Sequence, residues 1–155
     1  MNERLAAATI DRRTVLRGVG TIAATGVLAG CSGGGDGGGG NPNVPDEVSN
    51  YLSSANNYGS VPDETGSGSV TVEVGAGNGL AFGPAAVRIS TGTTVTWEWT
   101  GQGGTHNVVA EDGSFDSGEY QAAGTFEHTF DEAGNYNYYC EPHKMSGMKG
   151  AVIVE

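Results

Sequence analysis

The C-terminal two-thirds of the chain alternate apolar and polar residues with a period of two, the pattern of β-strands that bury one face. The first such run begins at Ser69, where valines alternate with threonine and glutamate. Further runs lie at residues 87–89, 95–99, 125–130, 136–139 and 151–154, separated by turns rich in Gly, Pro and Asn. Roughly seven or eight strands over about 90 residues is the size of a β-sandwich. The pattern therefore predicts an all-β fold, a Greek-key sandwich of antiparallel strands.

Two aromatic positions and one histidine test this interpretation of the strands. Trp97 and Trp99 fall on the same face of a regular strand, because side chains alternate between the two faces. They suit either core packing or an aromatic electron relay, and the pattern favours core packing. His128 lies within the alternating run 125–130, far from any other candidate ligand, and we expect it on the outward face as a residue that binds no metal.

The N-terminal third divides into an export signal, a tether and a lead-in to the strands. The pair Arg12 and Arg13 precedes a moderately apolar run at 19–28, the layout of a twin-arginine signal. That run is short and glycine-rich for a membrane span. It ends at Leu28-Ala29-Gly30-Cys31, which resembles the lipobox of exported lipoproteins and predicts lipidation of Cys31. The alternative is a plain secretory signal with an incidental cysteine.

The segments after Cys31 predict a domain held near a membrane by a flexible linker. Glycine fills most of residues 32–40, and such a stretch cannot bury apolar surface. A short helix is predicted within 45–57, where Val48, Tyr51 and Leu52 share a face. We therefore expect a signal at 1–30, a tether at 31–44, a helical or irregular lead-in at 45–68 and a β-domain at 69–155. The predicted location is the extracytoplasmic face of the cell membrane.

Charge excludes nucleic acid as a partner. The formal net charge is −11, and residues 1–30 contain four arginines against two acidic residues, so the remainder carries −13. Nucleic-acid phosphates require a basic surface, which residues 31–155 lack. The acidity suits either docking onto a basic partner or a salt-adapted surface of a halophilic archaeal protein. Because the carboxylates are scattered along the chain, a salt-adapted surface is favoured.

Candidate metal ligands cluster after the run 136–139. Cys140, His143 and Met148 lie within nine residues, and a second imidazole, His106, lies on an earlier loop. Two imidazoles, a thiolate and a weak thioether suit both oxidation states of copper. Zinc is the alternative metal, although Met is a poor zinc ligand. A disulfide between Cys31 and Cys140 is the alternative use of the two cysteines.

The spacing Tyr139-Cys140-x-x-His143-x-x-x-x-Met148 resembles the type 1 (blue) copper proteins of the cupredoxin family, and is most similar to the plastocyanin and halocyanin group. The runs at 104–107 and 80–84 are also similar, so the resemblance covers about residues 69–155. It implies a cupredoxin-like fold with one type 1 copper ion, whose ligands are His106, Cys140, His143 and Met148. It also implies that Asn107 donates a hydrogen bond near the Cys140 sulfur and ties the two ligand loops together. Met145 competes with Met148 for the axial position, and the plastocyanin-like spacing selects Met148.

These residues predict an electron carrier and not an enzyme. Four protein ligands leave the metal no open position for a substrate. We expect the chain to be a monomer that shuttles single electrons between membrane-associated redox proteins of a respiratory chain. The expected contact is the His143 edge within an apolar patch of Pro142, Met145 and Phe82. The alternatives are a copper store or chaperone, and an accessory domain without a carrier role of its own.

Overall fold

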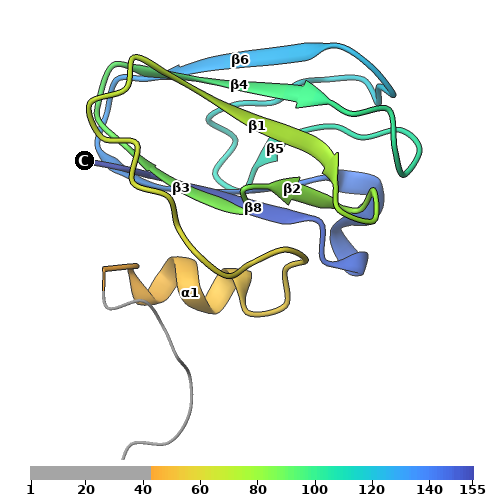
Figure 1. Ribbon diagram of the computed structural model, residues 1–155, viewed down its shortest axis with the longest axis horizontal. Helices are drawn as coiled ribbons and strands as arrows, with labels where there is room; N and C mark the ends of the chain where they lie inside the picture. Colours follow the sequence, from red (N-terminus) through yellow and green to blue (C-terminus); the bar gives the residue numbers. More distant parts are fainter. Residues whose placement is uncertain (1–42) are drawn as a thin grey trace, which may run out of the picture. The chain divides into compact units, whose positions relative to one another are not determined.

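The computed structural model describes residues 43–155, which form two four-stranded β-sheets and a short helix (Figure 1). The predicted signal, Cys31 and nearly all of the tether lie outside the described residues. In chain order the elements are α1 (Asp46–Leu52), β1 (Ser69–Ala76), β2 (Ala81–Gly83), β3 (Ala86–Ile89), β4 (Thr93–Trp99), β5 (Val109–Ala110), β6 (Thr125–Phe130), β7 (Gly134–Tyr139), the 3-10 helix η1 (Glu141–Ser146) and β8 (Lys149–Val154). Within 43–155, no helix is long and apolar enough to span a membrane.

The prediction of an all-β sandwich with about eight strands is confirmed. One sheet has the order β2-β1-β4-β6 and the other the order β3-β8-β7-β5. The expectation of purely antiparallel strands was wrong, because β1 pairs with β4 and β3 pairs with β8 in parallel. Side chains alternate between faces in both kinds of pairing, so the period of two does not reveal strand direction. The sequence pattern also missed β2 and β5, which have three and two residues and are too short to alternate visibly.

Trp97 occupies the centre of the main core, as predicted. Its side chain is fully buried and its ring packs against the rings of Phe115 and Tyr138, with centroids 5.2 Å and 5.4 Å away. Trp99 is buried on the same face. The large aromatic side chains therefore fill the space between the two sheets, where each buries a large apolar area.

His128 lies on the inner face of β6, so its predicted outward orientation was wrong. In the antiparallel pairing of β4 with β6 it lies opposite the buried Val95. Its ring contacts those of Phe115 and Phe130, with centroids 5.1 Å and 4.8 Å away. The alternation places His128 on the same face as Phe126 and Phe130, and this should have decided its orientation. Within 43–155, the group of potential metal ligands does not include His128.

Helix α1 covers the outer face of the β3–β8 sheet. Val48 and Leu52 are fully buried there, in a second apolar cluster with Ala151 and Ile153 of β8. Val152 and Val154 of β8 face the main core instead. Strand β8 is thus buried on both faces, which explains its continuous apolar sequence. Figure 1 shows α1 lying beneath β3 and β8.

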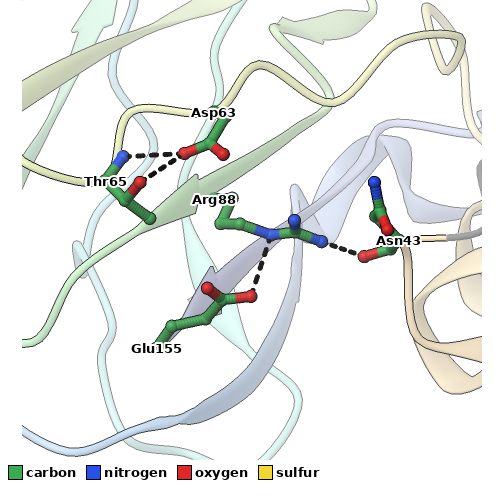
Figure 2. A network of polar contacts seen from close by, with 5 residues as sticks. All are labelled: Asn43, Asp63, Thr65, Arg88 and Glu155. Carbon is green, nitrogen blue, oxygen red and sulfur yellow. Dashed lines mark hydrogen bonds and ion pairs between the residues drawn. The ribbon is translucent and has the colours of Figure 1, made fainter.

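The lead-in between α1 and β1 is tied to the edge strand β3 around Arg88. The Arg88 backbone N–H donates to the carbonyl of Pro62 at 3.0 Å, and its carbonyl accepts from the N–H of Glu64 at 2.8 Å. Its guanidinium pairs with the Glu155 carboxylate at 3.1 Å and donates to the carbonyl of Asn43 (Figure 2). The backbone of Arg88 thus joins the lead-in to β3, and its side chain links β3 to Glu155 and to Asn43.

Candidate metal centre

Three predicted ligand atoms converge at one end of the sandwich. His106 lies on the loop after β4, Cys140 follows the last residue of β7, and His143 lies in η1. The two histidine Nδ1 atoms are 3.1 Å apart, and the Cys140 sulfur lies 3.6 Å from the Nδ1 of His106 and 3.4 Å from that of His143. Residues 37 positions apart in the chain are thus brought together by β7 and the loop that follows β4.

The dimensions of this triangle fit a bound metal ion. A point equidistant from the three atoms lies about 2 Å from each, close to the usual metal–nitrogen distance and slightly short of the metal–sulfur distance. The Nε2 atom of His106 lies 2.7 Å from the carbonyl oxygen of Gln102. Because a carbonyl only accepts, Nε2 carries the hydrogen and Nδ1 keeps a free lone pair facing the other two donors. The donor set therefore suits copper or zinc, and the thioether nearby favours copper.

Burial shields the donors of this site and favours the neutral form of His143. His106 is 1% exposed and Cys140 is fully buried as a free thiol, while His143 is half-buried. Burial raises the pKa of the Cys140 thiol, and the backbone N–H groups of Asn107 and His143 partly oppose this shift. Burial, and secondarily the neighbouring His106, lowers the pKa of His143. At neutral pH His143 is therefore uncharged, as a metal ligand must be.

Backbone hydrogen bonds close the ligand loop on itself. The N–H of Cys140 donates to the carbonyl of Met148 at 3.0 Å, and the N–H of Met148 donates to the carbonyl of His143 at 3.2 Å. η1 ends at Ser146 and is capped by Gly147, which adopts the left-handed conformation with φ 87°. These backbone bonds therefore link Cys140, His143 and Met148, the three residues of the loop that are expected to supply donor atoms.

The two loop methionines have opposite environments. Met148 is fully buried in the main core cluster, which also contains Cys140. Met145 is 99% exposed, so its side chain extends into solvent. An axial thioether must reach the inner side of the site, and only Met148 is buried there.

Asn107 ties the ligand loop to the loop that carries His106. Its side-chain oxygen accepts a hydrogen bond from the N–H of Glu141 at 2.8 Å, and its amide donates to the Glu141 carboxylate at 3.4 Å. One of the two backbone N–H groups near the Cys140 sulfur belongs to Asn107. Asn107 is 1% exposed, so these bonds lie beneath the surface of the site.

Two residues that hold His106 were not predicted from the sequence. Gln102 accepts from its ring, as described above, and Trp99 donates from Nε1 to the His106 carbonyl at 3.0 Å. The position of Trp99, at the end of the strand that leads into the His106 loop, could have indicated its contact with this loop. A buried indole N–H usually finds a partner, and the first loop carbonyls were the natural candidates.

Phe82 does not belong to the surface around His143, so this part of the predicted apolar patch was wrong. Its side chain is fully buried, and its ring packs edge-on against Tyr138 with centroids 4.8 Å apart. Strand β2 places Phe82 on the inner face of its sheet, where alternation buries it. Pro142 and Met145 are both exposed.

A β-sandwich with two imidazoles and a thiolate gathered at one end defines the class of small copper-binding proteins with a cupredoxin fold. The family model "Copper binding proteins, plastocyanin/azurin family" matches residues 68–155, and the chain belongs to this family. It is 48% identical to halocyanin of Natronomonas pharaonis over 160 residues, covering 94% of this chain and 98% of halocyanin. It is 40% identical to plastocyanin of Scenedesmus fuscus over 98 residues, covering 56% of this chain and 99% of plastocyanin.

Among solved structures, a purple cupredoxin from Nitrosopumilus maritimus is 31% identical, with a TM-score of 0.47, and the match covers 56% of this chain and 99% of that protein. From the family match, the halocyanin and plastocyanin relatives and the converging donors, the protein is a type 1 copper electron-transfer protein and not an enzyme. Its cofactor is one type 1 copper ion.

Proposed function

We propose that His106 and His143 bind the copper ion through Nδ1, that Cys140 binds it through its thiolate, and that Met148 supplies a weak axial thioether. The observation that carries this assignment is the convergence of two Nδ1 atoms and one sulfur within 3.1 to 3.6 Å of one another. The burial of Met148 and the exposure of Met145 support Met148 as the axial ligand. Bound copper supplies a one-electron Cu(II)/Cu(I) couple.

Neighbouring groups of the protein hold the proposed donors in place. Gln102 fixes the ring of His106, Trp99 fixes its backbone, and Asn107 joins the two loops. Donors held by such neighbouring groups keep their positions whichever charge the site carries. A site that moves little between two oxidation states suits rapid gain and loss of an electron.

The half-buried His143 provides the contact with redox partners in this proposal. Pro142 comes directly before His143 in η1 and Met145 two positions after it, and both are exposed, so together they offer a small apolar surface near the site. Redox encounters bury little area and separate quickly. A patch of this kind brings a partner close to the His143 ring without forming a lasting complex.

The proposed setting is the extracytoplasmic face of the cell membrane. Arg12 and Arg13 support twin-arginine export, and Cys31 within its lipobox-like run supports a lipid anchor on the glycine-rich tether. We propose a monomer that exchanges electrons with respiratory-chain proteins at that face. Mass spectrometry of the protein extracted from its membrane fraction tests the anchor. An unmodified Cys31 on a protein that still starts at Met1 would refute it.

Visible spectroscopy of the full chain loaded with Cu(II) tests the proposed site. We expect an intense thiolate-to-copper charge-transfer band that disappears on reduction and returns on oxidation. The Cys140→Ser variant should lack this band, because a hydroxyl does not replace the thiolate. Absence of the band in the parent protein would refute the ligand assignment. A colourless protein that binds only Cu(I) would indicate a copper store instead.

A further inference from the structure

Asn56 lies outside the region matched by the family model, yet it contacts the ligand loop directly. Its side-chain amide donates to the carbonyls of Ser146 and Leu80, both at 2.8 Å. Its backbone N–H donates to the carbonyl of Gly147, also at 2.8 Å. All three N–H groups of Asn56 are therefore bound to carbonyls of two other loops.

The lead-in packs closely against the ligand loop at Gly147. A Cβ atom on Gly147 would lie 2.7 Å from the carbonyl oxygen of Ser54 and 3.1 Å from the side-chain oxygen of Asn56. Lys149, just after the loop, donates to the Ser54 hydroxyl at 3.2 Å. The segment around Asn56 thus closes over residues 146–149 and leaves no room for a side chain at Gly147.

The two ligand-loop residues that Asn56 contacts, Ser146 and Gly147, directly precede Met148 in the chain. The N–H of Met148 is bonded to the carbonyl of His143, and its carbonyl is bonded to the N–H of Cys140. A displacement of Ser146 or Gly147 would therefore be passed to the backbone of three proposed ligands. The Leu80 bond anchors Asn56 on the other side, to the turn between β1 and β2.

We infer that Asn56 is a positioning residue for the copper site: it fixes the backbone next to Met148 and thereby tunes the axial ligand. Axial ligands and their surroundings set the reduction potential of copper sites of this type. The inference rests on the proposed copper site. It assigns a role in that site to a segment that precedes the family domain.

The test uses the full chain with Asn56→Ala, which removes both side-chain bonds, and Asn56→Ser, which keeps one shorter hydroxyl donor. Asn57→Gly is the matched control. Asn57 donates to the carbonyl of Phe82 and has φ 64°, a conformation that glycine adopts without strain. Amide hydrogen exchange of Gly147 and Met148 is measured by NMR in the metal-free and Cu(I) forms. The reduction potential is measured in the copper-loaded form.

In Asn56→Ala we expect exchange at Gly147 and Met148 to increase about tenfold, the effect of losing about one net hydrogen bond. Its reduction potential should differ from that of the parent. The exchange rates and reduction potential of Asn56→Ser should lie between those of the parent and of Asn56→Ala. Asn57→Gly should match the parent in both measurements. Unchanged exchange and potential in both Asn56 variants, or equal changes in Asn57→Gly, would overturn the inference. Absence of a charge-transfer band in the parent protein would instead refute the proposed site.

Discussion

At the scale of single residues, two methionines three positions apart are placed for different tasks. Met148 is fully buried beside Cys140, whereas Met145 is 99% exposed. Their chemistry is identical, so the difference comes only from η1 and the turn at Gly147. The spacing in the sequence selected Met148 over Met145 for the axial position, and burial supports the same choice.

Replacing Met148 by leucine should change the reduction potential and keep the colour. Leucine has a similar volume and should cost less than about 1.5 kcal/mol of stability. It removes the thioether, so a site that depends on a weak axial sulfur should shift in potential. Voltammetry of the Cu(II)-loaded variant measures this shift. Met145→Leu is the control and should leave the potential unchanged, and a shift in that control alone would identify Met145 as the axial ligand.

Replacing Met145 by glutamate should slow electron exchange between two copies of the protein. The added carboxylate would lie beside the proposed contact surface in both partners, and like charges that meet in an encounter oppose association. We expect about a tenfold decrease in the self-exchange rate measured by NMR on mixed Cu(I) and Cu(II) protein.

Thr91→Glu is the control for the Met145 substitution, because it adds the same charge elsewhere. Thr91 is exposed and its N–H donates to the carbonyl of Glu155, at the end of the sandwich away from η1. The visible spectrum should be unchanged in both variants. If both variants slowed electron exchange equally, the cause would be the added net charge, and the proposed contact surface around Met145 would be refuted.

At the scale of elements, two neighbouring glycines in the His106 loop have different roles. Gly103 and Gly104 both have positive φ, at 78° and 93°. A Cβ on Gly103 would overlap the carbonyl oxygen of Gly79, whereas a Cβ on Gly104 would meet nothing within 4 Å. The His106 loop thus approaches the β1–β2 turn closely at Gly103, and that approach requires the absence of a side chain.

Gly103→Ala should therefore be more destabilising than Gly104→Ala. For Gly104→Ala we expect a loss of about 1–2 kcal/mol, the cost of a left-handed conformation for alanine. For Gly103→Ala we expect about 1–3 kcal/mol more, because the two loops must also move apart. Denaturant unfolding of the metal-free variants measures both values. Equal losses of unfolding free energy in the two variants would show that the loops move apart at Gly79 with little cost.

The elements show why the sequence predicted some parts of the site and not others. Cys140, His143 and Met148 lie within one short segment, so their spacing alone was informative. The direction of β1 against β4 depends on chain topology, which alternation does not encode. The contacts of Asn56 with Ser146 span 90 residues, and nothing in the local sequence of either segment indicates them. Long-range polar contacts of this kind emerge only from the folded backbone.

At the scale of the molecule, all three basic side chains of residues 43–155 have partners within the fold. Lys144 pairs with Glu111 at 2.6 Å and lies over the ring of Tyr139, and Arg88 pairs with Glu155. The Lys149 ammonium donates to the hydroxyl of Ser54. Most of the charge on the surface of residues 43–155 is therefore carboxylate without a basic partner.

Unfolding free energy should consequently rise with salt. Carboxylates repel one another across the folded surface, and the screening length falls from about 10 Å at 0.1 M to about 3 Å at 1 M salt. We expect a gain on the order of 1 kcal/mol over that range, measured by urea unfolding in NaCl and in KCl. Agreement between the two salts excludes binding of one particular cation. A loss of stability would mean that screening of the Lys144–Glu111 and Arg88–Glu155 pairs outweighs relief of the repulsion, and the acidity would then be better explained by docking onto a basic partner.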